Sequence, residues 1–209
     1  MSKTINIYYV RHGETYFNAK NMIQGQCDAP LTPNGLSVAK TMAEKLKSIK
    51  FDAGYSSDLR RAVTTLDIIA DDNLPKYHLK EFREFGFGVY EGDSGVGFWD
   101  MMETKYNFKV NEIPFTEKYK YLYHEVDNPT AEKLDDFKTR LLKGFDHIID
   151  EAKKHDQKNI LLVGHGITIH AIIELISKEE FKGMVPNSSV TKIIHENNEF
   201  KIEYVGRLD

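Results

Sequence analysis

The chain has 209 residues, of which 41% are hydrophobic and 29% charged, a composition typical of a globular protein that can bury a full core. Its 28 Lys and Arg against 32 Asp and Glu give a formal net charge of −4, which argues against a broad nucleic-acid surface. No apolar run approaches the roughly twenty residues needed to cross a bilayer. Cys27 is the only cysteine, and the N-terminus lacks the pattern of a signal peptide. We therefore expect one cytoplasmic domain over residues 1–209, with no membrane or nucleic-acid partner.

An apolar segment near the N-terminus ends at an arginine and a histidine. Residues 5–10 are rich in Ile, Tyr and Val, which predicts a short buried strand, and Gly13 marks the turn that ends it. Arg11 and His12 therefore lie at the carboxyl end of this strand. Ligands bind at that edge of open α/β sheets, so these side chains indicate recognition of an anion such as phosphate. The alternative is a surface loop with two solvated polar side chains.

A helix is predicted to begin at Pro33. Thr32 can cap its first turn, Pro33 suits its first position, and Leu31 can pack against Leu36. The apolar positions that share one face of this helix are Leu36, Ala39, Ala43 and Leu46.

Two adjacent arginines open the next predicted helix. Residues 51–55 are predicted to form a second strand, and residues 56–58 offer polar caps for a helix over 59–69. Arg60 and Arg61 lie in the first turn of this helix, where basic side chains are unfavourable beside the positive end of the helix dipole. A bound anion would explain them, and solvation of two long side chains is the alternative.

The middle of the chain carries a loop with a glutamate and then an aromatic region. Residues 77–82 are predicted as a third strand that runs into a glycine-punctuated loop over 83–88. Glu84 follows this strand, as His12 follows the first. Residues 93–128 are irregular and rich in aromatic side chains, and we interpret the stretch 93–130 as an inserted cap over the sheet edge.

The last third of the chain continues the alternation of helices and strands. The predicted elements are a helix over 130–152, a strand over 159–163, a helix over 167–177 and strands over 190–195 and 200–205. His165 lies between two glycines just after the buried strand. Strands that alternate with helices favour an α/β fold, a three-layer α/β/α sandwich with a mostly parallel central sheet.

Both candidate histidines therefore follow a buried strand and stand beside glycine. They belong to a series of motifs: Arg11-His12-Gly13-Glu14-Thr15 with Asn18, Gln24-Gly25, Asp28-Ala29-Pro30-Leu31-Thr32 with Gly35, Ser56-Ser57-Asp58-Leu59-Arg60-Arg61-Ala62, Arg83-Glu84 with Phe87-Gly88 and Glu91-Gly92, Val163-Gly164-His165-Gly166, and the stretch 187–191. One motif alone would be weak, but this ordered set over nearly the whole chain is highly specific. In these motifs the chain resembles the histidine phosphatase superfamily, also called the phosphoglycerate mutase-like family.

The resemblance implies a mechanism in which His12 is the nucleophile. His12 would attack phosphorus through one ring nitrogen while a backbone carbonyl holds the other, giving a phosphohistidine. Glu84 would protonate the leaving oxygen and later activate water. The groups implied around the phosphoryl oxygens are Arg11, Arg61 and His165, with Asn18, Gln24, Gly25 and Gly166 on the substrate side. No metal and no cofactor is expected.

Phosphate-ester hydrolysis and phosphoglycerate mutation share the His12 step and differ in the acceptor pocket. Mutases of the family carry a basic insertion, usually with adjacent arginines, whereas residues 93–130 contain four lysines and no arginine. Phe85 and Phe87 stand where mutases use polar residues, and an aromatic cap suits an apolar or flat leaving group. We therefore expect a phosphomonoester hydrolase with a small phosphorylated substrate. The alternatives are a cofactor-dependent phosphoglycerate mutase and a non-catalytic protein that binds a phosphate ligand.

Other classes of protein fit the sequence poorly. Cys27 is not followed by arginine at the spacing of a cysteine phosphatase loop, and no Gly-rich loop ends in Lys-Ser/Thr. Gly92-Asp93-Ser94-Gly95 is similar to the nucleophile motif of chymotrypsin-like proteases, but no matching histidine segment precedes it. The other histidines form no spacing typical of a metal site: His78, His124, His147, His155, His170 and His195. The sequence gives no indication of the oligomeric state.

Overall fold

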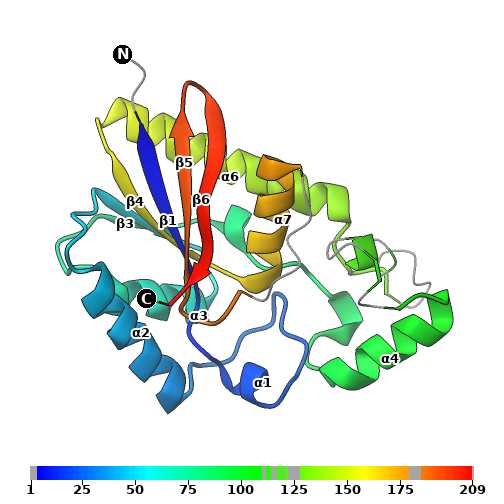
Figure 1. Ribbon diagram of the computed structural model, residues 1–209. Helices are drawn as coiled ribbons and strands as arrows, with labels where there is room; N and C mark the ends of the chain where they lie inside the picture. The colour runs from blue at the N-terminus through cyan, green and yellow to red at the C-terminus, as the bar shows by residue number, and fades with distance from the viewer. Residues whose placement is uncertain are drawn as a thin grey trace.

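Six strands of the described chain form one mixed sheet with helices on both faces (Figure 1). The computed structural model describes residues 4–109, 112–113, 117–119, 121, 128–178 and 185–208. The strands are β1 (Ile5–Arg11), β2 (Ala53–Ser56), β3 (Lys76–His78), β4 (Asn159–Gly164), β5 (Val190–Glu196) and β6 (Glu199–Arg207). The helices are α1 (Tyr16–Ala19), α2 (Pro33–Leu46), α3 (Arg60–Ile69), α4 (Gly95–Tyr106), α6 (Leu134–Lys154) and α7 (Gly166–Ser177), with 3₁₀ turns at Lys80–Phe82, Gly88–Tyr90 and Glu117–Tyr119.

β1 lies inside the sheet, whose strand order is β3-β2-β4-β1-β5-β6. The pairs β1/β4, β2/β4 and β2/β3 are parallel, whereas β1/β5 and β5/β6 are antiparallel. The register of β1 with β4 pairs Arg11 with Gly164. The residues that follow these two strands therefore leave the sheet side by side, which brings His12 and His165 to the same edge.

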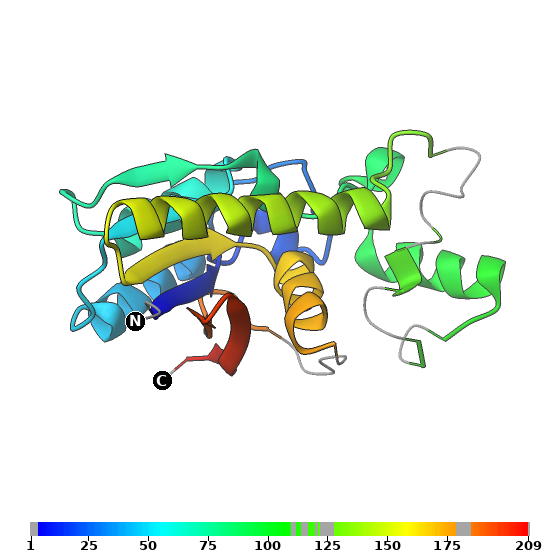
Figure 2. The same ribbon diagram turned by 90° about the horizontal axis from the view of Figure 1, so that it is seen from above.

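The two faces of the sheet bury different helices. Side chains alternate along a strand, so Ile5, Ile7 and Tyr9 share a core with α6 and α7, while Tyr8 and Val10 share a core with α2 and α3. Figure 2 shows α6 lying along one side of the sheet. The α/β sandwich expected from the sequence is confirmed, with its parallel part in the strands β3-β2-β4-β1.

The second and third strands differ from their expected ranges. β2 begins two residues later than expected, because Phe51 packs edge-on against Tyr8 with ring centroids 5.5 Å apart before the paired residues begin. β3 ends at His78, and residues 80–82 form a 3₁₀ turn instead of continuing the strand. Arg140 donates to the Glu81 carbonyl in this turn. That carbonyl is therefore not available to a strand partner.

Two helical expectations also change. The helix expected from Thr130 begins at Leu134. The residues before it bind the loop at Gly86 instead, because the Glu132 N–H donates to the Gly86 carbonyl at 2.9 Å. Leu36, expected on the buried face of α2, is 37% exposed. The buried positions of that helix are Gly35, Ala39, Met42 and Leu46.

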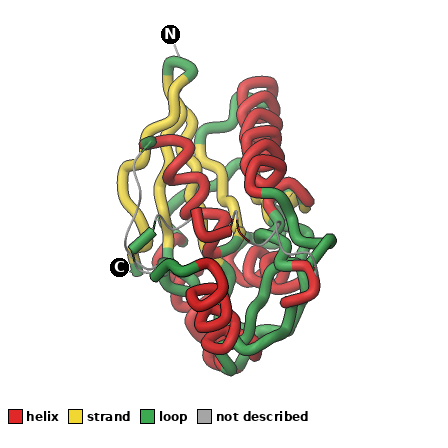
Figure 3. Tube along the Cα trace, turned by 90° about the vertical axis from the view of Figure 1, so that its right-hand side faces the viewer, coloured by secondary structure: helices red, strands yellow, loops and turns green. Residues whose placement is uncertain are grey.

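The region expected to be irregular contains α4. Ser94 caps this helix by accepting the N–H of Gly97 at 3.3 Å. Two glycines and two adjacent aromatic residues in its first turns obscure the apolar period that would predict a helix. In Figures 1 and 3, α4 lies beyond the carboxyl end of β1. The rest of the expected cap includes residues 110–111, 114–116, 120 and 122–127, among them His124, which lie outside the described residues.

The cap of α2 offers a test of the local sequence analysis. The Thr32 hydroxyl accepts the N–H of Gly35 at 2.9 Å and donates to Glu14 at 2.6 Å. We expect Thr32→Ala to lower the free energy of unfolding by about 1 kcal/mol and the melting temperature by about 2–4 °C, as measured by thermal denaturation. Thr32→Ser keeps the hydroxyl and should melt close to the wild type. An unchanged melting temperature for Thr32→Ala would contradict the stabilising role of this cap.

Candidate active site

Two histidines meet at the carboxyl edge of the sheet. His12 follows β1 and His165 follows β4, and their ring centroids are 5.2 Å apart with ring planes at 60°. Both side chains are buried, His12 with 4% exposure and His165 with 0%. The main chain of His12 is fixed, because its N–H donates to the Gly164 carbonyl at 2.9 Å and its carbonyl accepts from Asn187 Nδ2 at 2.8 Å. The structure thus brings the two predicted histidines together.

The hydrogen bonds of His12 determine its tautomer. Nδ1 lies 2.8 Å from the carbonyl oxygen of Gly13, which can only accept, so Nδ1 carries the proton and Nε2 holds the lone pair. Burial lowers the pKa of His12 well below its ordinary value, and the charges of Arg61 and Arg11 lower it further. The neutral imidazole that a nucleophile requires is therefore the stable form.

His165 presents a donor to the same site. Its Nδ1 accepts from Arg61 Nε at 3.2 Å, so the neutral ring carries its proton on Nε2, which is buried and has no hydrogen-bond partner in the described part of the chain. Burial, followed by the charge of Arg61, lowers the pKa of His165 well below its ordinary value. The Tyr9 hydroxyl holds the main chain of His165, accepting from its N–H at 2.6 Å and donating to its carbonyl at 3.0 Å. A Cβ on Gly164 would collide with this hydroxyl.

The guanidinium of Arg61 is fully buried and joins a loop to His165. Nη2 donates to the Gly25 carbonyl at 2.5 Å, and Nη1 donates to the Cys27 carbonyl at 2.7 Å and to Asp28 Oδ1 at 3.2 Å. Together with the bond from Nε, these contacts use four of the five guanidinium N–H groups. One N–H on Nη2 is left for another acceptor.

Asp28 has a role that the sequence analysis did not assign. Its carboxylate pairs with Arg61 and also accepts the backbone N–H of Arg60 at 2.5 Å, so it caps the N-terminus of α3. The sequence predicted this cap from residues 56–58, but the helix is preceded by Leu59, which has no side-chain acceptor. An aspartate more than thirty residues away therefore supplies the negative charge that the two arginines at this helix start require.

Glu91 holds the loop that carries the partners of Arg61. Its carboxylate accepts four backbone N–H groups at 2.8 to 3.1 Å, those of Gly25, Gln26, Cys27 and Phe87. The motif Glu91-Gly92 was recognised in the sequence, but no local pattern indicates partners some 65 residues away. Because Glu91 fixes the Gly25 and Cys27 carbonyls, it positions the guanidinium of Arg61.

Glu84 is buried against the start of α7. Its Oε1 accepts from the Phe85 N–H at 3.1 Å and from the Thr168 N–H and hydroxyl at 2.9 and 3.1 Å. Among the described residues, its Oε2 accepts only from the Ile167 N–H, at 2.9 Å. Burial raises the pKa of Glu84 above its ordinary value of 4.5, although these hydrogen bonds and the charge of Arg61 oppose the shift. Oε2 is therefore the oxygen with room for a further partner.

Thr15 orients two amide side chains expected at the site. Asn18 Oδ1 accepts from the Thr15 N–H at 3.1 Å and from Asn187 Nδ2 at 3.4 Å, so the amide nitrogen of Asn18 is left to donate. Gln24 Oε1 accepts the Thr15 hydroxyl at 2.6 Å. This bond leaves Gln24 Nε2 as a donor, and that atom is buried without a partner.

Gly25 and Gly166, both expected beside the substrate, lie against other residues of the protein. The Gly25 N–H donates to Glu91 at 2.9 Å and its carbonyl accepts from Arg61, so its amide is not directed at a ligand. Gly166 is the first residue of α7, and a Cβ there would lie 3.3 Å from the guanidinium carbon of Arg11. Both glycines allow close approach between parts of the protein, and the Gly25 amide, expected on the substrate side, is bound to the Glu91 carboxylate.

Three buried donors at this site have no partner within the described residues. Arg11 donates from Nη1 to the Val185 carbonyl at 2.6 Å, but its Nε is unpaired, as are Gln24 Nε2 and His165 Nε2. An unpaired buried donor costs about 1–3 kcal/mol. The ring of His165 lies 5.2 Å from that of His12 and the charge of Arg11 acts on His12, and an oxyanion bound beside His12 would satisfy unpaired donors of this kind.

The other residues discussed from the sequence take no part in this cluster. Burial, and next the carboxylate of Glu91, raise the pKa of the Cys27 thiol to about 12, so this thiol stays protonated. The Arg60 side chain is exposed, as the solvation alternative expects. Within the described ranges, no group of three or more His, Cys, Asp and Glu side chains is placed to hold a metal ion. None of the helices in those ranges has the length and apolarity needed to cross a membrane.

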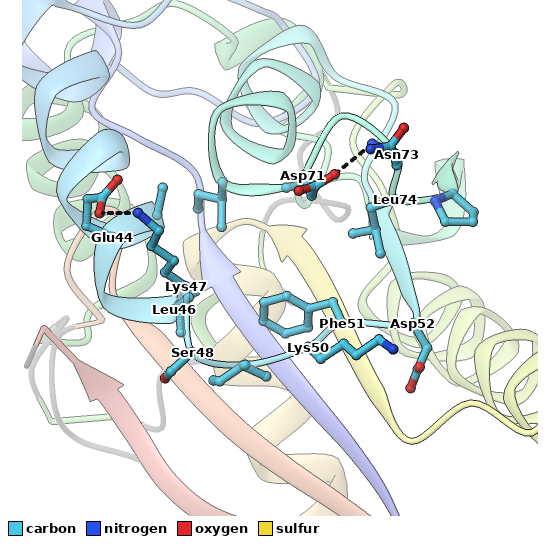
Figure 4. Close-up of a pocket in the computed structure, with 15 residues that line it drawn as sticks. Glu44, Leu46, Lys47, Ser48, Lys50, Phe51, Asp52, Asp71, Asn73 and Leu74 are labelled. Atoms are coloured by element: carbon cyan, nitrogen blue, oxygen red, sulfur yellow. Dashed lines mark hydrogen bonds and ion pairs between the residues drawn. The ribbon is translucent and has the colours of Figure 1, made fainter.

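A hollow of about 610 Å³ lies at the opposite end of the sheet, before β2 and β3 begin (Figure 4). Phe51 and Leu74 contribute apolar side chains to it, and the ion pair of Glu44 with Lys47 lies at 3.3 Å on its border. None of the residues that line it belongs to the histidine cluster. The cluster at the carboxyl edge therefore remains the candidate active site.

The role of Glu91 can be tested without assuming an activity. Glu91→Gln retains one acceptor oxygen but places an amide NH₂ against backbone N–H groups, and two donors cannot bond to each other. We therefore expect the free energy of unfolding to fall by about 2 kcal/mol and the melting temperature to fall by roughly 4–8 °C. Binding of inorganic phosphate, measured by calorimetry, should weaken as Arg61 loses its fixed position. Asp93→Asn, a nearby exposed change, is the matched control. Wild-type stability and phosphate affinity in Glu91→Gln would disprove this role.

Comparison with known proteins agrees with this geometry. The family model of the histidine phosphatase superfamily (branch 1) matches residues 7–207. "Putative phosphoserine phosphatase 2" of Hydrogenobacter thermophilus is 30% identical over 207 residues, which cover 97% of this chain and 95% of the relative. A broad-specificity phosphatase of Saccharomyces cerevisiae is 29% identical over 214 residues, covering 97% of this chain and 85% of that protein. The crystal structure of a phosphoglycerate mutase from Bacillus anthracis superposes with a TM-score of 0.93 at 31% identity, covering 99% of this chain and 95% of that one. This chain therefore belongs to the histidine phosphatase superfamily.

Proposed function

We propose that this protein is a metal-independent phosphomonoesterase that passes the phosphoryl group through His12. His12 Nε2 attacks phosphorus, the bond from phosphorus to the leaving oxygen breaks, and Glu84 gives its proton to that oxygen. Water then attacks the phosphohistidine, the P–N bond breaks, and a proton returns to Glu84 as inorganic phosphate is released. The observation that carries this proposal is the unprotonated Nε2 of a buried His12 in one cluster with the ring of His165, 5.2 Å away, whose Nε2 is an unpaired buried donor.

The donors around His12 suit a phosphoryl group in its transition state. Negative charge spreads over the three non-reacting oxygens during transfer, so fixed donors aimed at them lower the barrier. Arg11 Nε, His165 Nε2 and Gln24 Nε2 are the unpaired donors. The amide nitrogen of Asn18 and the last N–H of Arg61 complete the set. These groups are already held by the protein, so little reorganisation is needed when the substrate binds.

The hydrogen bonds of Glu84 support its role in proton transfer. Because Oε1 accepts three hydrogen bonds and Oε2 only one, the proton of the acid form is best carried on Oε2. Burial raises the pKa of this carboxyl, which makes the protonated form available at a pH where an exposed glutamate would be ionised. A phosphate dianion bound beside it would shift this pKa in the same direction.

The arginines favour hydrolysis over phosphoglycerate mutation. A mutase must also grip the carboxylate of its substrate. Arg83 pairs with Asp58 through two contacts at 2.7 and 2.6 Å, and Arg140 pairs with Glu132 through two contacts at 2.6 and 2.8 Å. Both arginines already hold a carboxylate of the protein itself, which supports a phosphatase. Similarity to the Bacillus anthracis mutase keeps mutation as the second candidate.

The aromatic residues give less information on the substrate than the sequence suggested. Phe85, Phe87, Phe98 and Tyr119 are at most 4% exposed and pack against one another at ring-centroid distances of 5.1 to 5.9 Å. They belong to the hydrophobic core that also holds Phe137 of α6, so they do not indicate a flat or apolar leaving group. We propose a small phosphorylated metabolite as the substrate, with 93–130 as the cap that determines specificity. The names of the Hydrogenobacter and yeast relatives support this class.

The proposal is tested by a phosphate-release assay in EDTA. The substrates are phosphoserine, 4-nitrophenyl phosphate and 3-phosphoglycerate, the last with and without its bisphosphate activator. We expect free phosphate from the esters and no isomerised phosphoglycerate, because the protein supplies all the catalytic groups. His12→Ala should lose turnover by at least about 10³-fold, whereas His155→Ala, an exposed position directly after α6, should retain it.

The three candidate functions give different results in this assay. Isomerisation without release would establish a mutase. Binding of phosphate esters without turnover of any of them would indicate a non-catalytic protein. Full activity of His12→Ala would disprove the phosphohistidine mechanism.

The pH dependence of kcat/KM tests the roles of Glu84 and His12 together. Turnover needs neutral His12 and protonated Glu84. The acidic limb should therefore lie well below pH 6.5, because the pKa of His12 is lowered, and the basic limb above pH 4.5, because the pKa of Glu84 is raised.

Glu84→Gln should remove the basic limb and slow alkyl esters by about 10²-fold or more, with a smaller effect on nitrophenyl phosphate. Glu81→Gln is the control, and an equal loss with both leaving groups would argue against Glu84 as the acid.

A further inference from the structure

One buried ion pair near the site has no role in the mechanism so far. Arg140 lies in α6 and Glu132 just before it, and their side chains are 19% and 14% exposed. Arg140 Nε and Nη2 donate to the two carboxylate oxygens of Glu132 at 2.6 and 2.8 Å. No motif in the sequence singles out either residue. Partly buried charges carry a desolvation cost, so an ion pair in this place calls for an explanation.

The rest of the Arg140 guanidinium is directed at the segment that carries Glu84. Nη1 donates to the carbonyls of Glu81 and Arg83, both at 2.7 Å, and Nη2 donates to the carbonyl of Glu84 at 2.9 Å. With the two bonds to Glu132, each of the five N–H groups has an acceptor. The plane of the guanidinium is therefore fixed by a complete set of hydrogen bonds.

Glu132 holds the same segment from its other end. Its Oε2 accepts the N–H of Gly86 at 3.1 Å, and its own N–H donates to the Gly86 carbonyl at 2.9 Å. The main chain is thus held before, at and after Glu84. The carboxylate of Glu84 is bound separately by the N–H groups of Ile167 and Thr168 at the start of α7.

We propose that Arg140 and Glu132 form a positioning pair that sets the place of Glu84 for proton transfer, an inference that rests on the proposed function. α6 fixes the main chain of this residue and α7 fixes its carboxylate, so the direction of Oε2 depends on both. Proton transfer requires the donor within hydrogen-bond reach of the leaving oxygen. A displacement of about 1 Å can lower a rate by roughly 10²-fold.

The test uses leaving groups that differ in their need for an acid. Nitrophenolate leaves without much protonation, whereas the alkoxide of phosphoserine needs a proton. Because Glu84 also takes up the proton of water in the step that both esters share, the comparison uses kcat/KM, which reports the phosphorylation of His12. We expect Arg140→Lys to lower kcat/KM for phosphoserine by about 10- to 100-fold and to change kcat/KM for nitrophenyl phosphate by no more than about twofold. Lysine keeps the positive charge but cannot make the five hydrogen bonds. Arg207→Lys, over the ring of Tyr204, is the matched control.

A double-mutant cycle separates this role from general loss of structure. In a Glu84→Gln background the acid is already absent, so adding Arg140→Lys should change the phosphoserine rate by no more than about twofold. The inference is overturned if Arg140→Lys slows both esters equally, if it retains the wild-type phosphoserine rate, or if its full loss persists in the Glu84→Gln background. Failure of the wild type to release phosphate from either ester would instead disprove the proposed function.

A second variant covers the case in which a single change prevents folding. Removing Arg140 alone leaves Glu132 buried and unpaired, whereas Glu132→Gln with Arg140→Met removes both charges, a replacement that proteins often tolerate. This double variant should show the same selective loss with phosphoserine. An equal loss with both esters would overturn the inference here as well.

Discussion

The buried guanidinium of Arg61 is the interaction on which the rest of the site depends. A fully buried cation is expensive unless it is paired and hydrogen-bonded, and this one is satisfied by Asp28, two backbone carbonyls and the ring of His165. Those partners come from a loop held by Glu91 and from the segment after β4. Placing one charge therefore requires that α3, the loop and the β4–α7 connection assemble together.

The same charge connects the structure to the chemistry. Burial, and next the charges of Arg61 and Arg11, lower the pKa of His12, which keeps its Nε2 unprotonated as the proposed attack requires, and the two cations favour a phosphate anion beside it. Arg61 also selects the tautomer of His165 that turns an N–H toward the site. Burial raises the pKa of Glu84, a carboxyl whose charge interacts with Arg61 and Arg11. The proposed mechanism uses the cations for the phosphoryl group and the protonated carboxyl for the leaving oxygen.

The sequence predicted the features that depend on local patterns of residues. The ends of two buried strands indicated His12 and His165 as site residues, and Thr32 caps α2, as its position before Pro33 predicted. The family motifs also contain residues that lie together in the site, among them His12, Arg61 and His165. What could not be predicted depends on distant partners: no local signal links Glu91 to the loop at residues 25–27, or Asp28 to the start of α3. The aromatic residues of the cap suggested a flat or apolar leaving group for the same reason, because composition does not reveal whether rings line a pocket or pack on one another.

The central claim is that phosphate transfer passes through a covalent bond to His12. The most direct measurement is to mix the enzyme with a phosphomonoester, quench in alkali within one turnover because phosphohistidine is labile in acid, and map the modified peptide by mass spectrometry. The account predicts one phosphoryl group on the peptide that contains His12, formed and lost at rates at least equal to kcat. Phosphate release at the full rate with no modification of His12, or with the phosphoryl group on another residue, would contradict it.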